Sequence, residues 1–126
     1  MNGNRSIGEV AAELGLDPDT IRYYERVGVL PPAPRDPAGR RQYPDDHVHL
    51  LEVLLRLKET GMPLADVAAF TRLVQQDPRG VPERLHLLRA HRERVLANRA
   101  ALDAALVLID RKIGDYAARA QPSRPS

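Results

Sequence analysis

The chain has 126 residues, no cysteine and a formal net charge of only +2 at neutral pH. This length gives one domain with a modest hydrophobic core and leaves no room for a separate ligand-binding domain. The lack of cysteine excludes disulfide frameworks, iron–sulfur clusters, thiolate metal sites and cysteine nucleophiles. Because the net charge is so small, it is a weak indicator of a nucleic-acid partner, and such a function has to be argued from motifs.

The N-terminal sequence MNGNRSIGEV shows no secretory signal. It lacks a basic region followed by an apolar run, and no apolar stretch of the chain approaches the roughly 18 residues that span a bilayer. The sequence therefore predicts a cytoplasmic protein that has no membrane partner.

The four histidines do not have a spacing typical of metal ligands. His47 and His49 lie beside two aspartates, but residues two apart on a helix point to different sides. His86 and His91 are five apart, and they would converge on a metal only if two subunits met in a dimer. No phosphate loop and no nucleophile with a matching base is found. The sequence thus predicts no metal, no cofactor and no enzymatic activity.

The first 28 residues predict two short helices joined by a tight turn. Ser6 and Glu9 have the Ser-x-x-Glu spacing of a capping box, and Gly15 ends the first helix. Asp17 can then cap a second helix over residues 18–27, which has proline at its first position. The apolar stripe of this second helix consists of Ile21, Tyr24 and Val27. Two such helices in succession are typical of a helix-turn-helix.

The segment 29–43 (VLPPAPRDPAGRRQY) is rich in proline. The Asp-Pro-Ala-Gly sequence at 36–39 supplies turn chemistry between two short flanks. Proline lacks a backbone donor and suits edge strands only. The segment therefore predicts a small two-stranded hairpin.

The remaining sequence predicts three more helices. Apolar spacing indicates a third helix over residues 45–61 and a fourth over 64–76. Residues 77–81 have the composition of a linker. A long helix is predicted over 82–118, followed by a disordered tail at 119–126.

The apolar residues of the long helix alternate at spacings of four and three, which is the pattern of a coiled-coil seam. The seam predicted to mediate dimerisation consists of Leu85, Leu88, Val95, Leu102, Leu106, Ile109, Ile113 and Tyr116. Arg92 and Arg99 occupy two further seam positions. Either their aliphatic stems cover apolar surface, or they pair with acids of a partner helix, such as Glu93 or Asp103, and fix its register. An isolated helix would leave the stripe in water, which favours a homodimer.

Taken in order, the motifs SIGEVA, TIRYYERVGVL, GRRQY and LKETGMPLADV, followed by the long helix, resemble the MerR (mercury-resistance regulator) family of bacterial transcription factors. The resemblance covers nearly the whole chain. It implies a mainly all-α fold, with a winged helix-turn-helix DNA-binding domain over 1–76 whose β-hairpin is the wing. The long helix would then pair antiparallel with its partner as a coiled coil. The cysteines of metal-sensing and redox-sensing members are missing, which excludes those forms of sensing.

The resemblance also implies a function. Such homodimers bind a pseudo-palindromic operator in double-stranded promoter DNA whose spacer is too long for RNA polymerase. A small-molecule effector lets the dimer bend and untwist this spacer, which activates transcription. Bending costs on the order of 1–6 kcal/mol, and protein–DNA contacts offset it.

By resemblance, the second helix is the recognition helix. Arg22 is expected to reach a base edge or a phosphate in the major groove, although a solvated arginine paired with Glu25 is the alternative. For Tyr24, core packing is as well supported as a phosphate contact. Arg40 stands where the family often has an aromatic residue, which leaves its role open. The predicted DNA-binding residues are Thr20, Arg22, Tyr23, Tyr24, Arg40, Arg41, Tyr43 and Lys58.

The charges of the first 43 residues set a condition for DNA binding. Residues 1–43 contain six arginines and six acids, so DNA binding requires that the two signs lie on different faces.

An effector site, if one exists, is expected where the fourth helix, the linker and a partner's long helix meet, with the candidate lining Phe70, Leu73, Val74 and Leu87. Two alternatives stay open: an effectorless repressor, and a helical protein-interaction module that does not bind DNA.

Overall fold

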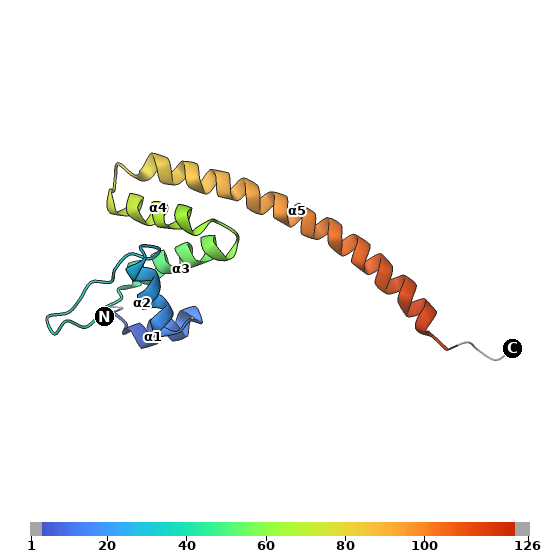
Figure 1. Cartoon of the computed structure of the whole chain (residues 1–126), viewed down its shortest axis with the longest axis horizontal. Coiled ribbons are helices and arrows are strands. Elements are labelled where there is room, and N and C mark those ends of the chain that lie inside the picture. Colours follow the sequence, from blue (N-terminus) through green and yellow to red (C-terminus); the bar gives the residue numbers. More distant parts are fainter. Residues whose placement is uncertain (1–3, 123–126) are drawn as a thin grey trace. The chain divides into compact units, whose positions relative to one another are not determined.

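The structure is a computed structural model, and it describes residues 4–122. This part of the chain forms the helices labelled in Figure 1, namely α1 (Ile7–Leu14), α2 (Pro18–Arg26), α3 (Asp45–Glu59), α4 (Leu64–Gln75) and α5 (Val81–Ala120). The mainly all-α fold predicted from the sequence is confirmed. The chain divides into two compact units, Met1–His91 and Arg92–Ser126, so the first turns of α5 belong with α1 to α4.

Local sequence explains where α1 and α2 begin. The predicted capping box is formed, since the Glu9 amide donates to Ser6 Oγ at 3.2 Å and the Ser6 amide donates to the Glu9 carboxylate at 3.1 Å. These hydrogen bonds hold the pKa of Glu9 below its ordinary value. Gly15 ends α1 in the left-handed conformation, with a φ of 69°. Asp17 is the N-cap residue of α2 by position, although its side chain makes no capping hydrogen bond there.

The segment between α2 and α3, residues 27–44, is called the wing below, and it has less strand structure than the sequence predicts. Within it, the structure has one antiparallel bridge, between Arg35 and Arg41, in place of a two-stranded hairpin. The prolines of the outgoing limb have no amide to donate, which stops the ladder from extending. The turn is closed by the Asp36 carboxylate, which accepts the Arg40 amide at 2.9 Å. That hydrogen bond lowers the pKa of Asp36.

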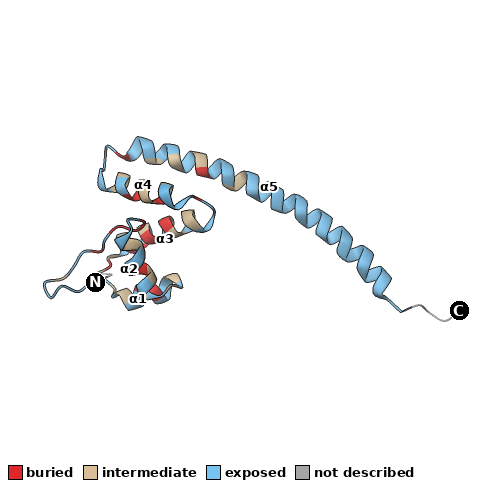
Figure 2. Ribbon diagram, viewed as in Figure 1, coloured by how far each residue is buried: buried red, intermediate tan, exposed pale blue. Residues whose placement is uncertain are grey.

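The first unit has a hydrophobic core to which α1 to α4 and the wing contribute (Figure 2). Within this unit, α1 packs against α2, and α3 packs against α4. The Thr71 hydroxyl of α4 donates to the Val29 carbonyl at 2.6 Å, which ties α4 to the start of the wing. The core consists of Val10, Ala11, Ile21, Val29, Leu30, Ala33, Tyr43, Val48, Leu51, Leu54, Met62, Val67 and Phe70.

The helix α5 extends beyond the predicted range 82–118 at both ends and includes the first two residues of the predicted tail. Residues 123–126 of that tail lie outside the described residues. In the first unit, His91 of α5 is buried, and its Nε2 lies 2.8 Å from Thr60 Oγ1. From Ala97 to Ala120, every residue is exposed (Figure 2). Neither α5 nor another helix in the described part of the chain is apolar over a length that would cross a bilayer.

The turn between α4 and α5 has no space for a side chain at Gly80. Gly80 is buried, and a Cβ atom built there would lie 2.8 Å from the carbonyl carbon of Leu73 and closer still to its oxygen. The same turn is closed by an ion pair between Asp77 and Arg84. Because the obstacle is backbone and not a flexible side chain, the turn itself would have to shift to accept a larger residue.

We therefore expect Gly80→Ala to lower the free energy of unfolding by about 1–3 kcal/mol, the usual range for overpacking. The matched control is Gly114→Ala, since Gly114 lies in α5 with open space around its Cα. There alanine should stabilise the helix by about 0.5–1 kcal/mol. Chemical denaturation at one fixed protein concentration measures both variants. Equal stability of Gly80→Ala and wild type would contradict the close packing of this turn.

Candidate nucleic-acid interface

The predicted recognition helix is α2, and two of its predicted DNA-binding residues reach solvent. Arg22 is exposed and donates to Asp19 at 2.8 Å, so the local partner is Asp19 and not Glu25. Tyr23 is also exposed, and the guanidinium of Arg26 lies 5.6 Å from the centre of its ring. An exposed pair such as Arg22–Asp19 contributes little stability, so Arg22 can exchange this partner for a phosphate or a base edge.

Tyr24 and Lys58 lie together beside the core. The ring of Tyr24 packs partly against the core, and Lys58 Nζ lies 5.5 Å from its centre. The ring of Tyr23 lies 6.0 Å from that of Tyr24. Core packing, one of the two alternatives for Tyr24, is therefore present. DNA contacts of Tyr24, Lys58 and the half-buried Thr20 stay predictions.

The predicted DNA-binding residues of the wing differ in accessibility. Arg40 is exposed and lies 3.5 Å from Asp36, whereas Arg41 is half-buried with its Nε 3.1 Å from Glu25 Oε1. Tyr43 is fully buried, because the wing folds its ring into the core, so the structure favours core packing for this residue and its DNA contact stays an untested prediction. Burial and the nearby charge of Glu25 raise the pKa of Tyr43 to about 12. Its hydroxyl therefore stays protonated at neutral pH.

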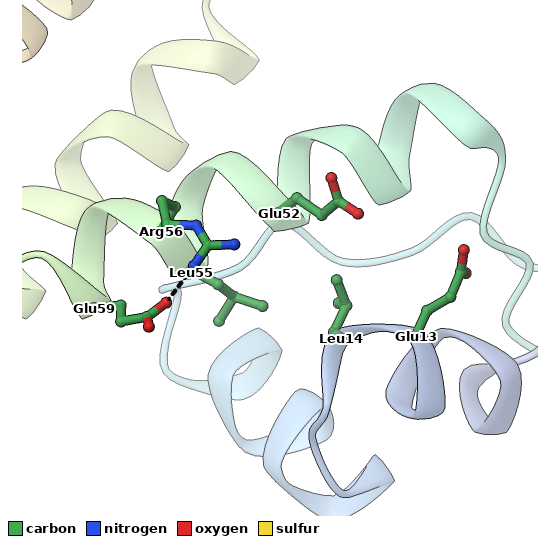
Figure 3. A pocket seen from close by; sticks show the side chains of 6 residues that line it. All are labelled: Glu13, Leu14, Glu52, Leu55, Arg56 and Glu59. Atoms are coloured by element: carbon green, nitrogen blue, oxygen red, sulfur yellow. Dashed lines mark hydrogen bonds and ion pairs between the residues drawn. The ribbon is translucent and has the colours of Figure 1, made fainter.

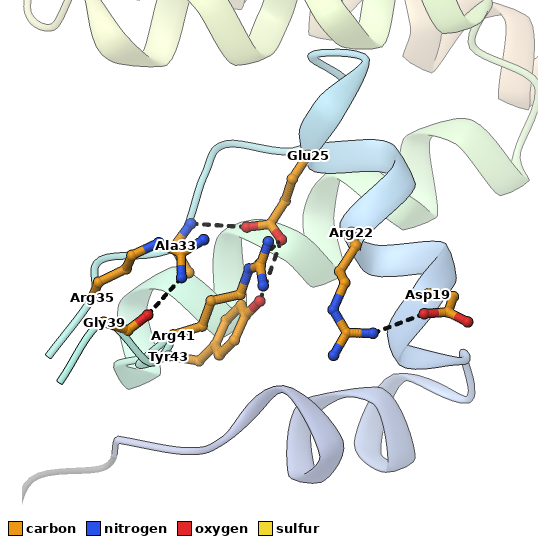
Figure 4. A network of polar contacts seen from close by, with 8 residues as sticks. All are labelled: Asp19, Arg22, Glu25, Ala33, Arg35, Gly39, Arg41 and Tyr43. Atoms are coloured by element: carbon orange, nitrogen blue, oxygen red, sulfur yellow. Dashed lines mark hydrogen bonds and ion pairs between the residues drawn. The ribbon is translucent and has the colours of Figure 1, made fainter.

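Glu25 is a site residue that the sequence did not reveal. Its carboxylate side chain is only 7% exposed, and it accepts hydrogen bonds from the Ala33 amide at 2.9 Å, Arg41 Nε at 3.1 Å and the Tyr43 hydroxyl at 3.5 Å (Figure 4). In the sequence, Glu25 stands at helical spacing from Arg22, which suggested a local pair. Its real partners are 8, 16 and 18 residues further along the chain, and no local pattern identifies them.

A pocket of about 320 Å³ lies between α2 and the wing. It is lined by Arg22, Glu25, Arg26, Pro32, Ala33, Arg35 and Arg41. Four guanidinium groups against one carboxylate give this pocket a positive charge. Because the planar fork of arginine matches the geometry of phosphate oxygens, the pocket has the chemistry to hold a DNA backbone phosphate.

A second pocket, of about 390 Å³, has the opposite charge and lies between α1 and α3 (Figure 3). Its lining residues are Glu13, Leu14, Glu52, Leu55, Arg56 and Glu59. The one arginine donates to Glu59 at 2.9 Å, so negative charge dominates and would repel phosphate. Charges of the two signs therefore collect in different pockets, which is the separation that DNA binding by this chain requires.

His47 lies against the wing. Its ring meets Tyr43 edge-on, with 5.7 Å between the ring centres. Burial lowers the pKa of His47, so the imidazole is neutral at neutral pH. Over the described residues, no group of three or more His, Cys, Asp or Glu side chains could hold a metal ion.

An open apolar pocket of about 240 Å³ lies between α4 and the start of α5, close to where an effector site was expected. Its lining residues are Phe70, Val81, Arg84, Leu85 and Leu88. Phe70 alone belongs to the predicted lining. Val74 and Leu87 pack against the core, and Leu73 faces Gly80 through its backbone carbonyl. The pocket thus uses the seam face of α5, whereas Leu87 lies on the face that packs against the core.

The seam predicted on α5 is exposed along most of its length. Among the predicted seam residues, the exposed ones are Leu85, Leu88, Leu102, Leu106, Ile109, Ile113 and Tyr116, and Val95 is half-buried. Arg92 is exposed and lies 3.9 Å from Glu93 of the same chain. Both alternatives for Arg92 and Arg99 therefore stay open. These large apolar side chains form an extended exposed apolar surface along one helix.

Two protein families match the chain. The family described as "MerR HTH family regulatory protein" matches residues 5–73, and the one described as "MerR, DNA binding" matches residues 48–114. The HTH-type transcriptional regulator AdhR of Bacillus subtilis is 32% identical over 91 residues, covering 72% of this chain and 65% of AdhR. The chain thus spans slightly less than two thirds of that relative's length.

Two further similarities extend over more of the chain. An uncharacterised HTH-type transcriptional regulator of Haemophilus influenzae is 32% identical over 108 residues, which cover 86% of this chain and 80% of the relative. The crystal structure of HiNmlR, a MerR family regulator lacking the sensor domain, bound to promoter DNA, has a TM-score of 0.85 to this chain at 30% identity. The match covers 91% of each of the two chains.

Proposed function

The chain belongs to the MerR family of helix-turn-helix transcriptional regulators, and from this premise we propose that it binds double-stranded promoter DNA as a homodimer. In this proposal α2 enters the major groove and the wing follows the adjacent backbone. HiNmlR, which is similar over 91% of its chain, was crystallised on promoter DNA. The proposed place of action is the cytoplasm, where promoter DNA and RNA polymerase meet.

The observation that carries the proposal is the arginine-lined pocket between α2 and the wing. Phosphate contacts supply affinity and orientation, and contacts to base edges supply sequence preference. We assign base or phosphate contact to Arg22 on α2, and phosphate contact to Arg40 and Arg41 on the wing. The acidic pocket between α1 and α3 would then face away from the DNA, because its carboxylates repel phosphate.

The homodimer is proposed from the exposed seam of α5. A pair of antiparallel α5 helices would cover both stripes and place two copies of α2 about a two-fold axis. Such a dimer suits a pseudo-palindromic operator, since the two half-sites repeat the symmetry of the protein. Transcription would be controlled by bending and untwisting the promoter spacer, which changes how RNA polymerase meets its two elements.

A second candidate is regulation without a small-molecule effector. The apolar pocket beside Phe70 has a volume of about 240 Å³ and is open to solvent. Ligand sites are typically about 300–1,000 Å³ and bury most of the ligand surface. In the single chain this pocket is small for an organic effector, and the proposed dimer would cover Leu85 and Leu88, which belong to both the pocket and the seam. Both features favour an effectorless repressor or architectural regulator. A transcription assay on a long-spacer promoter, with and without cell metabolites, separates the two candidates.

A footprint on the DNA upstream of the chain's own gene, at two salt concentrations, tests the proposed function. We expect a two-fold-symmetric protected patch between the promoter elements, weakened by salt because bound phosphates release counterions. A dimer in solution that protects no DNA at low salt would contradict DNA binding. It would favour the remaining alternative, a helical protein-interaction module.

A further inference from the structure

Glu25 is a negatively charged residue inside a surface that we propose binds a polyanion. It lines the same pocket as four arginines. Judged by charge alone, it should weaken DNA binding, because it repels phosphate and partly neutralises Arg41. Its surroundings suggest a different role, since the side chain is 7% exposed and accepts hydrogen bonds from three groups.

Those three hydrogen bonds join α2 to both limbs of the wing (Figure 4). Ala33 belongs to the outgoing limb, and Arg41 and Tyr43 belong to the returning limb. The limbs are tied to each other near the turn, where the Asp36 amide donates to the Arg40 carbonyl and the Gln42 amide donates to the Pro34 carbonyl, both at 2.8 Å. One carboxylate at the last turn of α2 thus adds direct polar contacts from that helix to both limbs, beside the core packing that holds the wing.

Glu25 contacts Arg41 through Nε and does not use the two terminal nitrogens of the guanidinium, which are the groups that can bind a phosphate. Glu25 accepts from Nε of Arg41, and the two terminal nitrogens of the guanidinium carry the remaining four donors. Holding Nε fixes the plane of the guanidinium, and a fixed plane loses less entropy when it binds phosphate through both terminal nitrogens. Lysine has three donors on one nitrogen, so it can contact both groups but has no planar fork to orient toward a phosphate.

From this geometry we infer that Glu25 is a positioning residue for DNA binding: it helps to hold the wing and aims the terminal nitrogens of Arg41 at a backbone phosphate. The inference rests on the proposed function. This inference and the argument from charge predict opposite changes in promoter affinity when the carboxylate of Glu25 is removed. Removal of the negative charge should weaken binding to the promoter, although the protein becomes more positive.

Glu25→Gln tests this sign. Glutamine has one acceptor oxygen and two amide donors, so it cannot accept all three hydrogen bonds. We expect affinity for a duplex of the chain's own upstream DNA to fall on the order of tenfold. Because a phosphate contact carries no sequence information, affinity for an unrelated duplex of equal length should fall by a similar factor. Circular dichroism and thermal unfolding check that the variant is folded.

The matched control is Asp17→Asn, which removes the same charge from the start of the same helix. Asp17 is exposed, its side chain makes no capping hydrogen bond, and asparagine is as good an N-cap residue. This control should bind the promoter duplex as tightly as wild type or slightly more tightly. If Glu25→Gln behaves like Asp17→Asn, the positioning role is wrong. If wild type binds neither duplex, the proposed function fails first, and this inference fails with it.

Arg41→Lys keeps the inference testable if Glu25→Gln does not fold. It preserves the charge and the carboxylate, so a purely electrostatic role predicts unchanged affinity, whereas positioning predicts a loss similar to that of Glu25→Gln. The double variant completes a mutant cycle. Because Glu25 acts through Arg41, the double variant should bind about as weakly as either single one. Wild-type affinity of Arg41→Lys, or fully additive losses in the cycle, would overturn the inference.

Discussion

Arg22→Ala should weaken binding to the promoter operator roughly ten- to hundredfold while leaving the fold and the dimer intact, since a good arginine–base contact is worth about 1–3 kcal/mol. Arg22 is exposed on α2, and its partner Asp19 is exposed as well. Losing such a pair changes the free energy of unfolding by less than about 1 kcal/mol. Titration of a labelled operator duplex measures affinity, and thermal unfolding measures stability.

Arg56→Ala is a closely matched control for this prediction. Arg56 is also exposed on a helix and also pairs with a carboxylate three residues away, Glu59, at 2.9 Å. It lies in the acidic pocket instead of the arginine-lined one. Its loss should therefore leave operator affinity within about twofold of wild type, apart from the shared loss of one positive charge. Equal losses in the two variants would mean that Arg22 acts only through net charge.

Specificity distinguishes the two possible contacts of Arg22. If Arg22 reads a base edge, alanine should relax the preference at one operator position and leave the salt dependence nearly unchanged. If it binds a phosphate, binding should weaken on all sequences, and the slope of log affinity against log salt should fall by about one. Wild-type affinity and wild-type specificity together would contradict any DNA contact of Arg22.

The helices could be predicted from the sequence because their signals are local. The capping box of Ser6 and Glu9, the stop at Gly15 and the apolar spacing each act within one or two turns, and the structure confirms them. The start and end of α5 were less well predicted. Pro122 stands two residues after Ala120 and is a stop signal that fits the observed end of α5 better than the predicted end at residue 118.

The wing could not be predicted to the same depth because its contacts are not local. The Asp-Pro-Ala-Gly turn was visible and its two limbs do pair antiparallel, but prolines limit the pairing to a single bridge, so the hairpin is shorter than the sequence predicted. Tyr43 lies two residues after Arg41 in the sequence, which suggested a role on the DNA side. Its burial is set by the packing of α2, α3 and the wing together. The hydrogen bonds that Glu25 accepts depend on the same packing. The sequence alone gives no distances in space, so it cannot show that Glu25 pairs with Arg41.

Leu106→Glu should convert the proposed dimer into a monomer. Leu106 is 54% exposed in the single chain and lies on the predicted seam. Burying a leucine side chain contributes about 1.5–3 kcal/mol, and two-fold symmetry counts each change twice. The expected loss of about 3–6 kcal/mol corresponds to roughly 100- to 10,000-fold weaker association. Sedimentation equilibrium over a range of protein concentrations measures this constant directly.

Leu108→Glu is the control that tests whether dimer loss requires a seam position or follows from changing any exposed apolar residue of α5. Leu108 is 60% exposed, so it is at least as accessible as Leu106, but it lies off the alternating spacing of four and three. Glutamate and leucine have similar helix propensities, so neither change should unwind α5. The control should therefore remain dimeric at concentrations where Leu106→Glu is monomeric. Dissociation of both variants would indicate a broader or different interface, and a stable dimer of Leu106→Glu would rule out the seam. A monomer has one copy of α2 and can hold one half-site, so the Leu106→Glu variant should also lose the symmetric footprint.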